Sequence, residues 1–539
     1  MKKKLSLLLS AALCICLMMA GCGVTQTVPE TGDNVSNTDT KQSKTLTFAA
    51  ASETTMLSPL YMGSFNHQTS MLVYETLLKY EDGEVKGNLA ENFSFNDDGT
   101  VLTLNLRQDV TFHDGEPFNA EAVKANLEFN QTNPSYMTLK AITDMVRVEA
   151  TDEYTVTITY SHPYYAYLYD FCWPDVMVMV SPKIIAPGDF QTVQGVVGTG
   201  PYTYAEYVQG KYTRFERNES YWGEKPYYDE IIDKYIPDST SRLQALKTGE
   251  IDMIFGGSLL SYEDYQQAIS IGGIDGLIAD MDTRARDMTL NASSEKLQDV
   301  KVRQAIAYAI DKSAISDGLA YGYESIADMP FPKGTPYTDF DLNTNYSYDQ
   351  DKANSLLDEA GWSMGTSGVR EKGGTPLSIT LTVDASFDAL NMPIATLIKS
   401  QLAEVGIEVS IISQEQMEWY SAYMAGEFDM TFWPTQYEYA SPHCFFTPMS
   451  MMTPQTASLS KVSDAQEFFD SITAVTQTDN PDEVQKIYNY LINYDLDNAI
   501  DIPLTYSKDM IVFNSDKISG YTFDGAPCFF NPQNVKSAE

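Results

Sequence analysis

Apolar residues follow two different periods along the chain. In the segments 102–106 and 155–160 every second residue is apolar, which is typical of a strand with one buried face. From Asp299 onwards, apolar residues instead recur every three or four positions, and this spacing predicts an amphipathic helix. Segments of both kinds are interspersed along the chain, so the pattern predicts a protein of the α/β class.

The segment 377–412 gives the clearest α/β signal. Residues 377–383 alternate as a strand, residues 394–405 have the spacing of a helix that ends at Gly406, and residues 407–412 alternate again. A strand, a helix and a second strand in this order predict a β-α-β unit with parallel pairing. Other periodic segments predict strands over 46–50, 502–506 and 510–513, and helices over 71–78, 353–360 and 482–496.

The N-terminal segment has a different pattern. Lys2, Lys3 and Lys4 precede an apolar run, residues 5–19, that is short for a membrane span and ends in Ala20-Gly21-Cys22. Small residues before a cysteine resemble a lipoprotein signal, so we expect residues 1–21 to be a lipoprotein signal peptide and Cys22 to carry a lipid anchor. An ordinary signal peptide with an incidental cysteine is the alternative. After Cys22, the rest of the segment 22–44 is polar and predicts a flexible tether.

Length and charge narrow the classes of function. A chain of 539 residues with 43% hydrophobic and 12% aromatic residues is too long for one core and predicts two or three folded lobes. The formal net charge of −39 argues against nucleic acid or an anionic membrane surface as a partner. The same charge mildly favours a cationic solute. The alternative is that the acidic residues only keep the protein soluble, which explains the charge as well.

The six cysteines give no disulfide framework, because three lie in the first 22 residues and the others have no CxxC or zinc spacing. Cys172 and Cys444 have apolar neighbours, which favours two buried thiols over a bridge between them. The sequence also has no phosphate-binding P-loop and no HExxH zinc motif. We therefore predict a protein that is not an enzyme and needs no cofactor, with an extracellular hydrolase as the distant alternative.

The segment 198–252 organises the chain. Gly198 and Gly200 flank Thr199 and permit a sharp turn before a strand, and the aromatic group around Trp222 can bury a large apolar area beside a polar turn. These features predict a hinge followed by a packed lobe.

This segment resembles the signature region of family 5 of the extracytoplasmic solute-binding proteins of ABC importers, a group with oligopeptide-, dipeptide- and nickel-binding members. The sequence is closest to that of the nickel-binding branch in two stretches, Phe215-Glu216-Arg217-Asn218-Glu219 and Tyr221-Trp222-Gly223-Glu224-Lys225-Pro226. A second match is the block from Phe112 to Val123, in which Asn119 is expected to cap a helix. Two further matching segments are Val302-Arg303-Gln304-Ala305 and Ala309-Ile310-Asp311-Lys312. The resemblance covers nearly the whole mature chain.

The resemblance implies a periplasmic-binding-protein-like fold of type II, cluster C, in which two α/β lobes meet at a hinge and a small α+β domain is added. The chain would cross between the lobes near residues 285 and 500. The implied parts are the first part of lobe I (45–87), the inserted small domain (88–197), the second part of lobe I (198–285), lobe II (286–499) and the C-terminal part of lobe I (500–539).

The resemblance also implies that solute is recognised by residues 429–449, a buried strand leading into a loop that reaches the cleft. The nickel-binding branch reads Thr-Trp-Gly-Ala-Pro-Tyr-Asp-Pro-His here. The matching residues are Thr435, Pro442 and His443, and the departures are Gln436, Ala440 and Ser441. Peptide-binding relatives pair the peptide's amine with the aspartate that Ser441 replaces, so this departure also weakens a standard peptide as the ligand.

A second departure from the nickel-binding branch is Asp175. The branch carries at this position an arginine that grips the carboxylates of a metal chelator. An acidic residue should disfavour a carboxylate there and favour a cation or a hydrogen-bond donor.

Residues in the cleft-facing segments of the family are candidates for contact with the solute. Aromatic side chains offer apolar area and, in tyrosine and tryptophan, a polar tip. His67, Asp175 and His443 could supply ligands to a transition metal, which makes His67 and His443 candidate metal ligands; simple hydrogen-bonding roles are the alternative. The ligand-binding candidates are Tyr61, Phe65, His67, Tyr136, Trp173, Asp175, Tyr437, Tyr439 and His443.

The function that follows is that of a monomeric, extracytoplasmic lipoprotein anchored to the cell membrane. It would capture a short peptide or peptide-like solute by hinge closure and deliver it to the permease subunits of an ABC transporter. A binding protein for nickel or another metal chelate is the alternative, and an adhesion or sensor lipoprotein would bind a protein instead. Nucleic acid is not expected as a partner. The sequence leaves open the solute, the permease, any pairing of cysteines and the resting state of the hinge.

Overall fold

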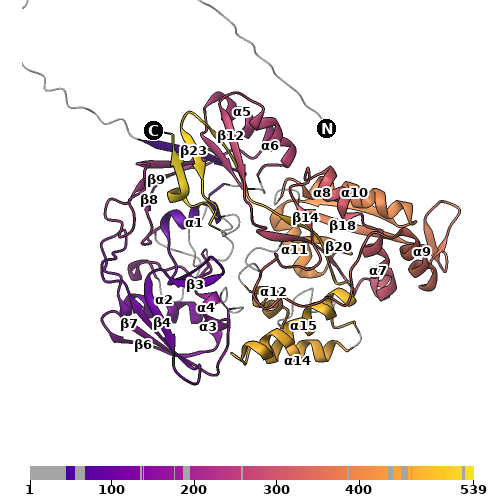
Figure 1. Ribbon diagram of the computed structural model, residues 1–539, viewed down its shortest axis with the longest axis horizontal. Coiled ribbons are helices and arrows are strands. Elements are labelled where there is room, and N and C mark those ends of the chain that lie inside the picture. Colours follow the sequence, from indigo (N-terminus) through magenta and orange to yellow (C-terminus); the bar gives the residue numbers. More distant parts are fainter. Residues whose placement is uncertain are drawn as a thin grey trace, which may run out of the picture. The chain divides into compact units, whose positions relative to one another are not determined.

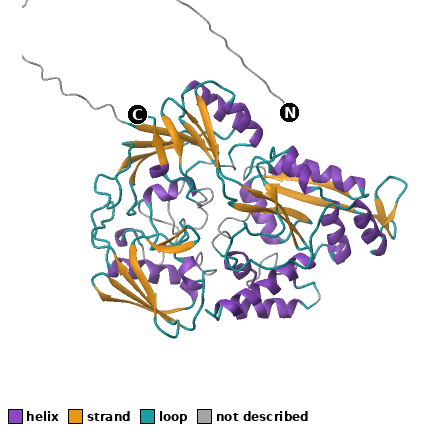
Figure 2. Ribbon diagram, in the orientation of Figure 1, coloured by secondary structure: helices purple, strands orange, loops and turns teal. Residues whose placement is uncertain are grey.

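The computed structural model describes the chain between residues 44 and 538, with gaps. In this part of the chain no helix is long and apolar enough to cross a membrane. Helices and strands alternate along the sequence (Figures 1 and 2). The described residues are 44–51, 53–54, 67–133, 136, 139–174, 176–185, 195–256, 259–384, 388–434, 441–450, 459–462, 464–524 and 529–538.

The largest sheet has seven strands that come from the beginning, the middle and the end of the folded chain (Figure 1). Its central strand β1 (Thr45–Ala50) runs parallel to both of its neighbours, and the other pairs are antiparallel. The strand predicted over 46–50 is therefore confirmed. In spatial order the strands are β12 (Ile274–Ile278), β22 (Met510–Asn514), β11 (Met253–Phe255), β1, β10 (Glu230–Tyr235), β9 (Tyr212–Arg217) and β8 (Tyr202–Val208).

A smaller antiparallel sheet forms between residues 90 and 160. Two of its strands confirm the alternating segments 102–106 and 155–160. Asn119 caps the following helix α2 (Ala120–Thr132), as predicted, because its side chain accepts a hydrogen bond from the Ala122 amide at 3.0 Å. The strands lie in the order β4 (Ala90–Phe95), β5 (Val101–Leu106), β7 (Thr155–Tyr160) and β6 (Met145–Asp152).

Helix α1 (His67–Val73) ends earlier than the helix predicted over 71–78, and that prediction is wrong beyond Val73. The carbonyl of Val73 accepts a hydrogen bond from the Gly200 amide at 2.9 Å, and Leu78 begins strand β2 (Leu78–Glu81), which pairs with β3 (Glu84–Gly87). Residues on both sides of this boundary are buried, so the apolar spacing continues although the helix does not.

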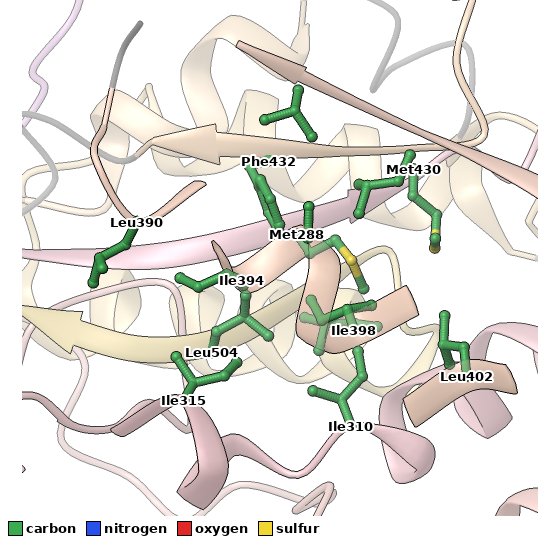
Figure 3. Close-up of a cluster of buried hydrophobic side chains, with 14 of the residues drawn as sticks. Met288, Ile310, Ile315, Leu390, Ile394, Ile398, Leu402, Met430, Phe432 and Leu504 are labelled. Atoms are coloured by element: carbon green, nitrogen blue, oxygen red, sulfur yellow. The ribbon is translucent and has the colours of Figure 1, made fainter. Parts of the chain in front are cut away.

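The second large sheet has six strands and contains the predicted β-α-β unit. Strands β18 (Ser378–Asp384) and β19 (Glu408–Gln414) run parallel and are joined by helix α10 (Asn391–Glu404), which confirms the prediction for 377–412. Apolar side chains of α10 pack against those of the central strands, as Figure 3 shows for Ile394 beside Phe432. The strands lie in the order β14 (Ser325–Ile326), β21 (Asp501–Ser507), β13 (Arg284–Leu290), β20 (Met430–Pro434), β18 and β19.

Helices flank this sheet (Figure 2). A second apolar cluster lies among the later helices. The helix predicted from Asp299 is confirmed, with Asp299 as its cap, and so is the helix predicted over 482–496. The helices are α7 (Val300–Ala309), α8 (Lys312–Gly318), α9 (Gln350–Glu359), α11 (Gln416–Ala425), α12 (His443–Phe446), α14 (Ala465–Val475) and α15 (Pro481–Asp497).

The chain passes between the two large sheets at two places. It leaves the seven-stranded sheet after β12 and enters the six-stranded sheet with β13, so the first crossing covers residues 279–283. It returns between β21 and β22, at residues 508–509, a few residues after the position that the resemblance implied. The crossings contact each other, since the Lys508 ammonium donates a hydrogen bond to the Asp280 carbonyl at 2.7 Å.

Asp233 on β10 is expected to make the free energy of unfolding depend on pH. Its side chain is buried and accepts a hydrogen bond from the Thr54 hydroxyl at 2.8 Å, and burial raises its pKa to about 7. The folded state therefore holds this proton more tightly than the unfolded state, so the stability from Asp233 is complete below about pH 4 and is lost as the pH rises through about 7.

We expect Asp233→Asn to flatten the dependence of the free energy of unfolding on pH between pH 4 and pH 7, by up to about 1.4 kcal/mol per pH unit. Denaturant unfolding across that range measures the change. Glu84→Gln removes an exposed carboxylate from β3 and serves as the control, which should keep the wild-type slope. An unchanged slope in Asp233→Asn would show that folding does not raise the pKa of this carboxyl.

Candidate functional site

A buried pair of polar side chains, within hydrogen-bonding distance, joins two segments that are 273 residues apart in sequence. The imidazole Nε2 of His443, at the start of α12, lies 2.9 Å from Oδ1 of Asp170, at the end of helix α4 (Tyr167–Asp170). The side chains are only 4% and 1% exposed. The other carboxylate oxygen of Asp170 accepts the Ala141 amide at 2.8 Å, so the carboxylate is held from two sides.

Tyrosines surround this pair. The rings of Tyr164, Tyr165 and Tyr169 lie with their centroids 6.1–6.4 Å from the His443 ring. The Tyr165 hydroxyl hydrogen-bonds the Ser441 hydroxyl at 2.8 Å and the Tyr488 hydroxyl at 2.6 Å. Burial raises the pKa of Tyr165 well above its usual value, so these hydroxyls stay neutral.

The backbone adds to the same contact. The Tyr165 amide donates a hydrogen bond to the carbonyl of Thr478, which lies between α14 and α15, at 3.1 Å. We call the contact formed by Asp170, His443, Tyr165, Ser441 and Tyr488 the bridging contact. It fixes the chain just before Trp173 to Ser441 and His443, which belong to the predicted recognition segment 429–449.

His443 is thus already bonded by a protein carboxylate, and Nε2, the nitrogen that Asp170 holds, is not open to a solute in this structure. Tyr136 is 1% exposed in an apolar cluster, where its hydroxyl donates a hydrogen bond to the Val176 carbonyl at 2.9 Å. Trp173 is half-buried against the same cluster. The other predicted positions lie outside the described residues, together with the His67 side chain: Cys22, Tyr61, Phe65, Asp175, Tyr437 and Tyr439.

A group of charged residues at the start of β13 was not predicted from the sequence. The Arg286 guanidinium lies 2.9 Å from a Glu324 oxygen and 2.7 Å from Asp388, and Arg284 lies 3.3 Å from Asp388. All four side chains are at most 10% exposed. Burial opposes the charge of Arg286, but Asp388 and Glu324 raise its pKa well above the usual value. The signal was three charged residues, Arg284, Arg286 and Asp287, in a strand that is otherwise mostly apolar.

These charges border a cavity of about 20 Å³, which is room for about one water molecule. Phe432 and Trp433 complete its wall at the end of β20, directly before the predicted recognition loop. Arginines are the natural partners of a solute carboxylate, but here protein carboxylates already bond them.

Residues of the signature segment surround another carboxylate, that of Glu75, which is half-buried. Glu75 accepts hydrogen bonds from Thr199 at 2.7 Å, Tyr221 at 2.9 Å and Trp222 at 2.9 Å. Burial raises its pKa, and the three donors partly offset that rise. This bonding gives the signature residues a structural role. A Cβ on Gly198 would collide with the carbonyl oxygen of Val73, so glycine is required there.

Glu75 also lines a polar cavity of about 170 Å³, together with Lys79 and Asp524. Among the described residues, no three histidine, cysteine or acidic side chains are grouped so that they could hold a metal ion. Cys172 is buried and Cys444 half-buried, and the two do not form a disulfide, in agreement with the prediction of thiols.

Residues Gly361 to Gly365 match the GxSxG spacing of serine hydrolases. In those enzymes the serine lies on a sharp turn between a strand and a helix. Here Ser363 is exposed in the short strand β15 (Ser363–Met364), opposite Glu371, and a helix precedes it. The motif therefore lacks the local structure that would activate a nucleophile.

Two large sheets are joined by two adjacent crossings. The bridging contact bonds the chain that follows the small sheet to helices beside the six-stranded sheet. This arrangement is that of a hinged binding protein. Residues 84–456 match the family described as bacterial extracellular solute-binding proteins, family 5 Middle, and the chain belongs to this family. The resemblance found in the signature segment is therefore confirmed, and so is the two-lobe α/β fold.

The relatives differ in what they bind. The chain is 31% identical to the nickel-binding periplasmic protein of Escherichia coli K12 over 86% of this chain and 91% of that protein. It is 29% identical to the glutathione-binding protein GsiB of Pectobacterium atrosepticum over 69% of this chain and 70% of GsiB.

Two solved structures extend the comparison. NikA from Brucella suis in complex with Fe(III)-EDTA has a TM-score of 0.84 at 30% identity, over 92% of this chain and 99% of NikA. AppA from Bacillus subtilis in complex with a nonapeptide has a TM-score of 0.76 at 20% identity, over 92% of this chain and 99% of AppA, which supports the fold alone.

Proposed function

We propose that this protein captures a short peptide or peptide-like solute between its two lobes and delivers it to an ABC permease. The observation that carries the proposal is the bridging contact, because it joins the small sheet to the helices of the second lobe beside the predicted recognition loop. A contact of this kind is what a closed binding protein needs at the mouth of its cleft.

The crossings at residues 279–283 and 508–509 are the proposed hinge. Two adjacent extended connections allow rotation of one lobe against the other with little change inside either lobe. A solute that contacts both lobes stabilises the closed state over the open state, and the permease would distinguish the two.

The described residues favour a solute that carries polar groups over a bare metal ion. His443 is bonded by Asp170, so it is not poised to bind a bare metal ion. The arginines of β13 are cations and do not bind metal ions, and protein carboxylates already bond them. A peptide, or a metal ion that a chelator already binds, fits these residues better than a bare metal ion does. A nickel or other metal chelate is the second candidate, because relatives at 31% and 30% identity are named for nickel binding and solved with Fe(III)-EDTA.

The proposed setting is the outside of the cell membrane. A lipid on Cys22 would anchor the chain, and the polar segment up to residue 44 would let a monomeric body reach the permease. Metabolic labelling with a fatty acid, compared between the wild type and Cys22→Ser, tests the anchor.

Thermal unfolding of the mature chain without its lipid tests the ligand class. The chain is scanned with di- to pentapeptides, glutathione, and nickel with and without free histidine. A ligand at about a hundred times its dissociation constant adds about 2.7 kcal/mol of stability. We expect stabilisation by peptides. Stabilisation by nickel and histidine together, and by no peptide, would make the second candidate correct, and no shift with any of them would contradict both.

A further inference from the structure

Helix α11 carries apolar side chains on an inner face and on a second, exposed face about a third of a turn away. Its inner face packs on the six-stranded sheet: the Trp419 indole donates a hydrogen bond to the Thr431 hydroxyl at 2.8 Å, and the Tyr423 ring stacks on Trp433 with centroids 4.6 Å apart. Its outer face carries Met417, Tyr420 and Met424, which are 62%, 39% and 46% exposed. A helix with apolar residues all round is normally buried on all sides, so the outer face needs an explanation.

The exposed strip continues onto the sheet. Ile412 on β19 is 45% exposed and pairs in register with Thr382, which also pairs with Thr431. Side chains that are directly opposite on neighbouring strands point to the same face of a sheet. Thr431 faces α11, so Ile412 also lies on the α11 side. β19 is the last strand in the order of the sheet, which leaves this edge accessible.

Only acidic charges occur near the strip in the sequence. Between residues 404 and 428 there is no lysine or arginine, and five glutamates occur there. All five are exposed, and within the part of the chain that the structure describes none of them has an ion-pair partner. The glutamates are Glu404, Glu408, Glu415, Glu418 and Glu427.

We propose that Ile412, Met417, Tyr420 and Met424 form a docking strip for a basic amphipathic segment of a second protein. Methionine side chains are flexible and polarisable, so they adapt to the apolar face of a partner helix. The ring of glutamates would pair with lysine and arginine residues at the edges of that helix. The same glutamates would repel an anionic membrane surface, which favours a protein partner over lipid.

A model peptide tests the docking strip in the full mature chain. The probe is an 18-residue peptide of leucine and lysine with leucines at helical spacing, labelled for fluorescence anisotropy, and the matched peptide has the same composition without a continuous apolar face. We expect the helical peptide to bind at least about tenfold more tightly than the matched peptide, because only the former presents apolar area to the strip.

Variants separate the strip from the general negative charge of the protein. Met417→Gln with Met424→Gln should weaken the helical peptide at least about tenfold. The control Val146→Gln with Met364→Gln removes two apolar side chains that are 65% and 52% exposed elsewhere and should leave binding unchanged. The thermal midpoint of each variant checks the fold. Equal binding by all variants, equal binding of both peptides, or methionine-dependent binding to phosphatidylcholine vesicles without binding of the peptide would overturn the proposal.

Discussion

Replacing His443 with alanine is expected to lower the free energy of unfolding by about 3–5 kcal/mol. The change leaves the Asp170 carboxylate buried, with its neighbours Tyr164 and Tyr165 and without the imidazole at 2.9 Å. A buried carboxylate that loses a hydrogen-bonding partner retains its penalty of desolvation without the compensation from that partner. Denaturant unfolding at neutral pH measures the difference.

A double-mutant cycle distinguishes this pair from simple loss of packing. Asp170→Asn removes the charge and keeps the shape, and the double variant Asp170→Asn with His443→Ala should be destabilised by less than the sum of the two single changes. Additive effects would mean that the two side chains do not stabilise each other. If His443 instead binds a metal, the single change should abolish stabilisation by nickel while leaving the metal-free protein nearly as stable as the wild type.

Replacing Arg286 with methionine is expected to destabilise the second lobe by a similar amount, about 3–5 kcal/mol. Arg286 bonds both oxygens of Glu324 and one oxygen of Asp388, at 2.7–3.1 Å. The Glu324 side chain is 0% exposed. In the variant, the guanidinium that balances the negative charge of this buried carboxylate is missing. Denaturant unfolding of the full mature chain measures the loss.

The chain offers a matched control for this prediction. Arg214 on β9 pairs with Glu206, Glu216 and Glu230 at the surface, and Arg214→Met should cost less than about 1 kcal/mol because water screens those pairs. Adding Glu324→Gln to Arg286→Met should restore part of the stability. Equal effects of Arg286→Met and Arg214→Met would show that burial of the charged group contributes little.

The sequence predicts the fold well where the information is local. The period of apolar residues located β5, β7 and the β-α-β unit from β18 to β19, and the position of Asn119 identified the cap of α2. The signature segment identified the family. Each of these signals depends on residues within one element or on its borders.

The site depends on distant pairs, and a single sequence does not contain that information. His443 was predicted to contact the solute, but its partner Asp170 lies in another part of the fold. Arg286 meets Glu324 and Asp388 only because three separate segments converge at one end of the sheet. The early end of α1 has the same cause, since Gly200 bonds its last carbonyl from a distant segment.

The bridging contact also affects how solute binding should be understood. A closed arrangement that protein side chains already stabilise needs less energy from the solute to form. On the proposed function, the solute would then contribute mainly through the predicted recognition loop and Trp173. Weakening the bridging contact should therefore lower the affinity for solute even where no contact to the solute is lost.

Equilibrium dialysis of the mature chain against a mixture of short peptides and nickel–histidine, followed by mass spectrometry of the retained and the released solute, tests the central claim most directly. The account predicts that the chain retains one class of solute, saturates at one molecule per chain, and releases that solute with its mass unchanged. Release of a cleaved product, or no saturable retention of any solute, would contradict it.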